Sequence, residues 1–174
     1  PRSDSFFGLI QELVAPSVFR LLVVTCLLNQ TRGKVAIPAF WSLLARYPDA
    51  VALSEANLEE LSSMLQPLGL HNVRAKRLIE MSKKFVEAPP MEDKVFKSRA
   101  KDCPPTPINH YPGVGRYAVD SYRIFIADGG SQVAFPKENA ADEDQPEWKK
   151  VMPLDKELRA YLIWRWAKAG IEWD

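Results

Sequence analysis

Apolar residues recur along the chain at helical spacing, and no segment alternates apolar and polar positions as a half-buried β-strand does. Residues 19–28 are apolar on nearly every side, which predicts a central buried helix. A first helix is expected after a cap at Ser3 or Asp4, with an inward face of Phe6, Phe7, Leu9, Ile10, Leu13 and Val14. Further helices are expected at about 35–47, 58–65, 72–86, 117–126 and 154–169. The sequence therefore predicts an all-α protein.

Two segments interrupt this pattern. Residues 88–107 are rich in proline and charge, and residues 129–145 are rich in glycine and acidic side chains. Both are interpreted as flexible insertions, and residues 48–56 as a connector. With 174 residues, 47% of them apolar, the chain can bury a substantial core without disulfides or metals. Residues 1–174 are interpreted as a single domain, and the start at Pro1 suggests a piece of a longer protein.

Charge is balanced overall but unevenly distributed. The formal net charge is only +1, whereas basic residues gather in 74–84 and again in 94–101. A basic middle within a near-neutral chain is compatible with one face that meets DNA. Solvated helix faces are the simpler explanation of any one basic cluster, so charge alone does not establish nucleic-acid binding.

Cysteine and histidine are too few for several kinds of chemistry. Cys26 and Cys103 supply neither a disulfide framework nor the four ligands of a zinc or iron–sulfur site, so no metal site is expected. His71 and His110 stand in loops without a nucleophile or ligand pattern around them. The lack of a disulfide framework favours a reducing, intracellular location. The apolar run 21–28 is too short to cross a bilayer, so we expect no membrane contact.

The most informative turn is Pro112-Gly113-Val114-Gly115-Arg116. Two glycines two residues apart allow a tight turn with positive φ and close approach of a partner. Apolar residues at 119, 122, 125 and 126 then recur at helical spacing, so the turn leads into a helix N-terminus. The unpaired N–H groups and partial positive charge of such an end suit a phosphate. The turn is therefore interpreted as the hairpin of a helix-hairpin-helix DNA-binding element.

Carboxylates are the remaining candidates for catalysis. Asp155 opens the last predicted helix, where aspartate is a favoured N-cap, and the cap is the simpler interpretation. The two roles are compatible, because a helix N-terminus favours negative charge and an ionised carboxylate can stabilise positive charge developing on a sugar. Asp120 competes for the catalytic role, but the Ser-Tyr-Arg that follows it favours a hydrogen-bonded or ion-paired structural aspartate.

Several short blocks together resemble the helix-hairpin-helix superfamily of DNA glycosylases. They are Phe7-Gly8-Leu9-Ile10-Gln11-Glu12, Leu28-Asn29-Gln30-Thr31-Arg32-Gly33-Lys34, Gln66-Pro67-Leu68-Gly69-Leu70, Arg74-Ala75-Lys76, Pro112-Gly113-Val114-Gly115-Arg116-Tyr117 and Asp120-Ser121-Tyr122-Arg123-Ile124-Phe125. Within the superfamily the chain is most similar to the mismatch-specific thymine glycosylase domain of methyl-CpG-binding-domain protein four. The resemblance spans about 3–166, with the two insertions unmatched. It implies a two-lobed, all-α glycosylase fold with a DNA groove between the lobes.

The resemblance assigns three residues to the site of base release. Asp155 matches an aspartate that stabilises the oxocarbenium-like sugar and orients water at C1′. Tyr117 matches an aromatic residue of the base pocket, where relatives with lyase activity carry a Schiff-base lysine, so hydrolysis without strand cleavage is implied. Gln11 matches a glutamine whose amide can pair with a thymine or uracil edge. From the residues alone, Gln11 on a helix surface and Tyr117 in the core are simpler interpretations.

The resemblance also assigns two residues to loops that enter the duplex. Leu70 would be the apolar wedge, and Gln30 would fill the space left by the flipped nucleotide and probe the guanine opposite it. The most similar branch carries arginine where Gln30 stands, which leaves open how strongly guanine is required. From the residues alone, Leu70 is equally well explained as a hydrophobic contact at a helix end.

The implied function is a monofunctional DNA glycosylase of base excision repair in the nucleus. Its expected partner is double-stranded DNA with thymine or uracil opposite guanine, bound by a monomer. No iron–sulfur cluster is expected, although such hairpins can hold a monovalent cation. Two alternatives stay open, namely a non-catalytic helix-hairpin-helix DNA-binding module and a glycosylase for another damaged base. Phosphate binding alone requires neither Asp155 nor Gln11, which favours an enzyme.

Overall fold

The chain divides into two compact units. The computed structural model describes residues 5–132 and 145–170. The terminal unit joins Pro1–Ser17 to Asp120–Asp174, and the central unit is the continuous stretch Val18–Val119. Helices build both units, and within the described residues extended pairing is limited to an isolated bridge between Phe96 and Thr106. The prediction of an all-α protein is confirmed.

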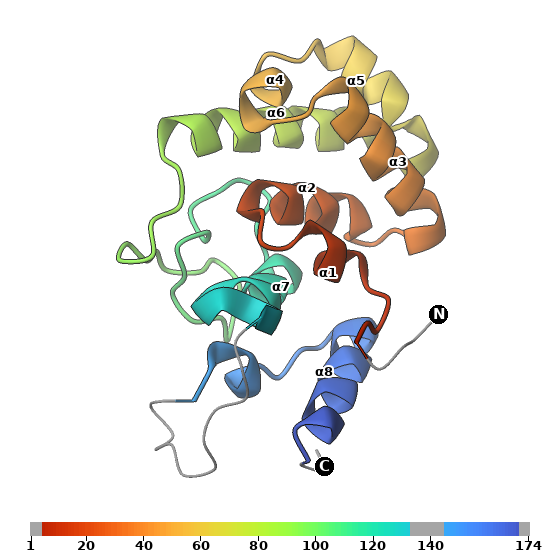
Figure 1. Ribbon diagram of the computed structural model, residues 1–174. Helices are drawn as coiled ribbons and strands as arrows, with labels where there is room; N and C mark the ends of the chain where they lie inside the picture. Colours follow the sequence, from red (N-terminus) through yellow and green to blue (C-terminus); the bar gives the residue numbers. More distant parts are fainter. Residues whose placement is uncertain (1–4, 133–144, 171–174) are drawn as a thin grey trace. The chain divides into compact units, whose positions relative to one another are not determined.

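The helices that lie wholly within the central unit (Figure 1) are α2 (Val18–Leu28), α3 (Gly33–Arg46), α4 (Ala50–Ser54), α5 (Leu58–Met64), the 3-10 helix η1 (Gln66–Leu68) and α6 (His71–Glu87). Helix α6 packs on α4 and α5, and α2 packs on both α3 and α6. The predicted buried helix is α2, in which Leu21, Val23 and Leu27 are fully buried. The core of this unit therefore forms around α2.

A short helix, α4, stands where a connector was predicted. Asp49 caps it, because its carboxylate accepts a hydrogen bond from the N–H of Ala52 at 2.8 Å. Ala50 and Leu53 are buried on its inner side. The prediction of a connector at 48–56 missed this helix, because one cap and two buried side chains are enough to support a helix packed on α6.

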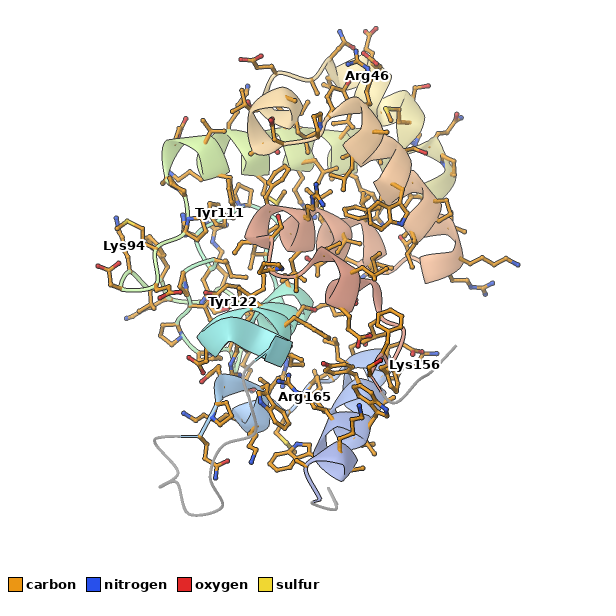
Figure 2. The ribbon with its side chains drawn as sticks, viewed as in Figure 1. Arg46, Lys94, Tyr111, Tyr122, Lys156 and Arg165 are labelled. Carbon is orange, nitrogen blue, oxygen red and sulfur yellow. The ribbon has the colours of Figure 1, made fainter. Side chains whose placement is uncertain are left out.

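After α6 an irregular segment leads to the glycine hairpin, as predicted for 88–107. Its middle is closed by the Phe96–Thr106 bridge, with N–H···O distances of 3.0 and 3.2 Å. The amide of Asn109 donates to the Phe96 carbonyl at 2.8 Å. The hydroxyl of Tyr111, labelled in Figure 2, donates to the Ala88 carbonyl at 2.7 Å. Hydrogen bonds thus tie the end of this segment to its beginning.

The terminal unit contains α1 (Ile10–Val14), the end of α7 (Arg116–Phe125), η2 (Ala127–Gln132), η4 (Glu147–Lys150) and α8 (Lys156–Lys168). Helix α7 begins in the central unit and ends in this one. Aromatic side chains form the core: the ring centre of Tyr161 lies 5.7 Å from that of Phe7 and 4.6 Å from that of Phe125. Burial raises the pKa of Tyr161 to about 12. The residues before α1 and those of α7 are thereby held on α8.

Helix α1 begins later than predicted. The expected caps Ser3 and Asp4 lie outside the described residues, and the helix starts at Ile10. Gly8 has φ +114, which interrupts a helix. The carboxylate of Glu12 accepts hydrogen bonds from the N–H groups of Phe7, Gly8 and Leu9 at 3.1, 2.8 and 2.8 Å. The expected inward face is correct for Phe7, Ile10 and Val14 and wrong for Leu13, which is exposed.

Part of the predicted acidic insertion at 129–145 cannot be placed, because residues 133–144 lie outside the described residues. Along the described stretches, none of the helices is both long enough and apolar enough to cross a membrane.

Candidate functional site

The glycine turn at 112–116 leads directly into α7, as predicted. The N–H of Val114 donates to the Tyr111 carbonyl at 3.3 Å, and the Gly115 carbonyl accepts from Val119 at 3.0 Å. Gly113 has φ +82, a conformation that favours glycine. The expectation of positive φ at both glycines is wrong for Gly115, which lies outside the left-handed region. The position that a Cβ would take at Gly115 has no atom within 4 Å, so this glycine provides room for a partner.

Arg77 of α6 lies against this turn. A Cβ at Gly113 would stand 2.6 Å from Cδ and 3.0 Å from Cγ of Arg77. The aliphatic stem of Arg77 thus covers the turn, and the residue as a whole is exposed. Backbone N–H groups and a nearby cation form a combination suited to a phosphate. Turns at 107–110, rather than a regular helix, precede the hairpin.

The two predicted duplex-entering residues share an unusual backbone conformation. Gln30 has φ +57 and Leu70 has φ +50, both left-handed. Such a conformation costs a non-glycine residue about 1–2 kcal/mol. Both side chains are exposed, and Leu70 exposes 68% of its surface. A helix-end contact therefore does not account for Leu70, and strain of this kind is concentrated at functional sites.

Asp155 is the N-cap of α8, as its position predicted. Its Oδ1 accepts hydrogen bonds from the N–H groups of Glu157 and Leu158, each at 2.9 Å. The residue is half-buried. Within the described part of the chain Oδ1 is the carboxylate oxygen that accepts these hydrogen bonds, so Oδ2 can bind water or a substrate. The helix N-terminus thus fixes the orientation of the carboxylate and favours its negative charge.

Gln11 is buried rather than on a helix surface, so the simpler interpretation of this residue is wrong. It exposes 2% of its surface, and its Nε2 lies 3.5 Å from the Oγ of Ser121 in α7. A buried amide needs polar partners, and this side chain can offer one donor and one acceptor edge to a base. Asp120, the competing carboxylate, is buried beside Ser121 in α7.

Tyr117 lies in the first turn of α7 and is half-buried, so it is not a core residue. Gln11 and Asp155 belong to the terminal unit, whereas Gln30, Leu70 and the hairpin with Tyr117 belong to the central unit. In the ranges 5–132 and 145–170, no group of three or more histidine, cysteine or acidic side chains is arranged to hold a metal ion.

The burial of Arg74 is a feature that pattern reasoning missed. The sequence placed it in the exposed basic cluster, but it is 8% exposed, whereas its neighbours Lys76 and Arg77 are exposed as expected. The guanidinium of Arg74 bonds to the loops that carry Gln30 and Leu70. The sequence carried two signals for Arg74: it belongs to the block Arg74-Ala75-Lys76 that resembles the glycosylase superfamily, and the dipole of a helix disfavours a cation near its N-terminus.

Known proteins resemble this chain in sequence and in fold. Residues 23–162 match the profile of the HhH-GPD superfamily base excision DNA repair proteins. The chain is 33% identical over 98 residues to a thymine/uracil-DNA glycosylase of Pyrobaculum aerophilum, covering 56% of this chain and 39% of that protein. It is 33% identical over 111 residues to a thymine-DNA glycosylase of Aeropyrum pernix, covering 64% and 45%. It is 30% identical over 161 residues to the methyl-CpG-binding domain protein 4-like protein of Arabidopsis thaliana, covering 92% and 28%.

The chain spans less than half the length of each of these three relatives. The solved structure of a thermostable thymine-DNA glycosylase matches with a TM-score of 0.50 and 17% identity, covering 64% of this chain and 51% of that one. The likeness supports the same helical fold. Because the family profile covers most of the sequence, this chain belongs to the HhH-GPD superfamily of base excision DNA repair proteins.

Proposed function

We propose that this protein is a DNA glycosylase that removes thymine or uracil paired with guanine. The observation that carries the proposal is Asp155, a half-buried carboxylate with one oxygen fixed at the N-terminus of α8. A hairpin with room for a phosphate and two exposed, left-handed residues supply the other features that action on a duplex requires. Two relatives named above are thymine or thymine/uracil glycosylases, which supports the choice of base.

The proposed reaction begins with extrusion of the mispaired base. A weakly paired base costs a few kcal/mol less to unstack than a matched one, which supplies part of the selectivity. Leu70 enters the duplex as the wedge, Gln30 occupies the space that the base leaves, and the Gln11 amide binds the imide edge of the base. The hairpin and the exposed basic residues bind phosphates, so affinity falls with salt.

Asp155 then acts on the sugar. Its carboxylate stabilises the positive charge that develops at C1′ and orients a water molecule. The bond from C1′ to the base nitrogen breaks, and the base leaves with the electron pair. The water oxygen bonds to C1′, and the proton that the water loses neutralises the departing base. Tyr117 cannot form a Schiff base, so the product is an abasic site in an intact strand.

Labelled duplexes with thymine·guanine, uracil·guanine, adenine·8-oxoguanine or matched pairs test this function. The wild-type protein should release thymine and uracil opposite guanine, with strand breaks only after alkali. Asp155→Asn should abolish release yet bind DNA, because asparagine is as good an N-cap as aspartate. Glu157→Gln, an exposed carboxylate-to-amide change on the same turn, should keep the wild-type rate.

Each outcome separates one alternative. Strand breaks without alkali contradict the monofunctional mechanism, and excision confined to adenine identifies a different glycosylase. Binding without release from any duplex favours a non-catalytic DNA-binding module. Wild-type excision by Asp155→Asn shows that another group performs the catalysis.

A further inference from the structure

The guanidinium of Arg74 connects two loops that are distant in sequence. Its Nε donates to the Gly69 carbonyl at 3.1 Å, and its Nη1 donates to the Cys26 carbonyl at 3.0 Å. Its Nη2 donates to the Asn29 carbonyl at 3.0 Å and to the Thr31 hydroxyl at 2.9 Å. A single buried side chain at the start of α6 therefore holds both the α2–α3 loop and the turn before α6.

The atoms that Arg74 binds flank the two left-handed residues. Asn29 and Thr31 stand on either side of Gln30, and Gly69 immediately precedes Leu70. Left-handed non-glycine residues persist only where their surroundings over-determine the backbone. The Leu70 carbonyl also accepts the N–H of Arg74 at 2.9 Å. The contacts of one residue thus fix the backbone that projects both side chains into solvent.

We propose that Arg74 is the positioning residue for base extrusion: it sets the spacing between the Gln30 loop and the Leu70 loop so that both enter the duplex together. This inference rests on the proposed function, in which those two side chains act on DNA. Arg74 itself is buried and touches no substrate; it acts through the loops that it holds.

Lysine at this position could not replace the arginine. The planar guanidinium reaches four acceptors in three directions, whereas an ammonium is a compact point charge at the end of a flexible stem. Arg74→Lys keeps the positive charge and the helix propensity but removes the planar set of N–H donors. The variant therefore tests the hydrogen-bond geometry rather than the charge. The loops should still form, but their spacing and their left-handed residues should no longer be fixed.

Single-turnover excision from two substrates distinguishes a role in positioning the two loops from a role only in stabilising the fold. One substrate is a duplex with thymine opposite guanine; the other holds the same thymine in a bubble of unpaired bases, where no wedge is required. Arg74→Lys should lower the duplex rate about tenfold or more, which corresponds to about 1.4 kcal/mol. The bubble rate should change less than about twofold, because an already unpaired base needs no extrusion.

Leu70→Ala and Arg46→Lys are the matched variants. Leu70→Ala removes the wedge directly and should show the same duplex-specific loss, and adding Arg74→Lys to it should produce little further loss. Arg46 also makes two hydrogen bonds between elements of the central unit, from α3 to Glu60 of α5 at 2.8 and 3.3 Å (Figure 2). Arg46→Lys should leave both rates unchanged, since it lies outside the two loops.

Amide hydrogen exchange provides a readout that does not depend on catalysis. In Arg74→Lys, exchange should accelerate at residues 29–32 and 69–72 and stay unchanged in α3 and α5. Three results would each overturn the positioning role. The first is an equal loss of excision rate on duplex and bubble, and the second is a rate loss that adds to that of Leu70→Ala. The third is unchanged amide exchange in both loops. Inactivity of the wild-type protein on every substrate refutes the proposed function instead, and the exchange result then decides separately whether Arg74 fixes the loops.

Discussion

The guanidinium carbon of Arg165 lies 4.0 Å from the ring centre of Trp148. The same guanidinium donates through Nη1 to the Ile124 carbonyl at 3.0 Å, so α8 is tied to both η4 and α7 (Figure 2). Arg165 is buried, and burial lowers its pKa. The aromatic face and the carbonyl oxygen thus replace part of the water around the charge. This contact holds the helix that Asp155 caps.

Arg165→Met should therefore destabilise the terminal unit. Methionine keeps much of the length but leaves the Ile124 carbonyl without this donor, which costs about 1–3 kcal/mol for a buried group. Urea unfolding followed by tryptophan fluorescence measures the loss. Lys168→Met is the control, because Lys168 on the same helix is exposed and lies 4.5 Å from the ring centre of Trp164. An exposed cation–π contact contributes about 0.5–1 kcal/mol, so equal losses in the two variants would contradict the role of burial.

The helices could be predicted because their signal is local. The apolar residues of α2 predict a buried helix without knowledge of its neighbours, and the glycine turn predicts the start of α7. The start of α1 and the existence of α4 were missed, because both depend on single side chains, Glu12 and Asp49, that satisfy a few N–H groups. Such caps decide where a short helix begins and leave little trace in hydrophobic periodicity.

The candidate site could be predicted only where resemblance supplied the residues. The position of Asp155 in the sequence predicts an N-cap, but its chemical role does not follow from that position. Burial of Gln11 and Arg74 contradicts pattern reasoning, which places polar residues outside. Their partners come from other parts of the chain, Ser121 for Gln11 and Asn29 for Arg74. Tertiary hydrogen bonds of this kind cannot be inferred from spacing along one helix.

Stability should fall as the solution becomes acidic, partly because of His110. Burial lowers the pKa of His110 below the ordinary 6.5, and the charges of Lys84 and Lys94 act in the same direction. Its Nε2 lies 3.3 Å from the Ala88 carbonyl, and this hydrogen bond raises the pKa, but burial has the larger effect. The unfolded chain therefore binds the proton more readily than the folded chain. The contribution of neutral His110 to the free energy of unfolding is complete above pH 6.5 and is lost as the pH falls through the lowered pKa.

His110→Gln should reduce this pH dependence. Urea unfolding at a pH of about 7.5 and of about 5.5 should show a smaller difference in unfolding free energy for the variant than for the wild type. Leu53→Ala removes buried apolar atoms and no titrating group, so it should lower stability by the same amount at both pH values. An unchanged difference in His110→Gln would show that the imidazole is not a source of the acid sensitivity.

Replacements at Asp155 should separate its two roles. Asp155→Ala removes the acceptor of two N–H groups and should cost about 1 kcal/mol of stability, whereas Asp155→Asn should cost little. Both should lose excision, because neither carries a negative charge at C1′. Thermal unfolding and single-turnover assays on the same preparations measure the two effects. Loss of excision in Asp155→Ala alone would mean that the residue matters only as a cap.

Replacement of the two hairpin glycines should affect stability and DNA binding differently. Gly113→Ala forces a Cβ into a left-handed residue and against the stem of Arg77, 2.6 Å away, so it should cost about 1–2 kcal/mol of stability and weaken DNA binding. Gly115 is under neither constraint. Threonine ranks about equal with glycine at a helix N-cap, so Gly115→Thr should unfold like the wild type.

Gly115→Thr should nevertheless weaken DNA binding, because its side chain fills the space through which a phosphate reaches the backbone. Fluorescence anisotropy with a labelled duplex over a range of salt concentrations measures this effect. Because Arg77 beside the turn would neutralise the same phosphate, displacement of this phosphate should lower the slope of log affinity against log salt by about 1, whatever the sequence of the DNA. Because the variant folds normally, a reduced slope assigns the lost contact to the hairpin itself. Wild-type affinity and slope would mean that the phosphate lies elsewhere and that Gly115 only permits the turn.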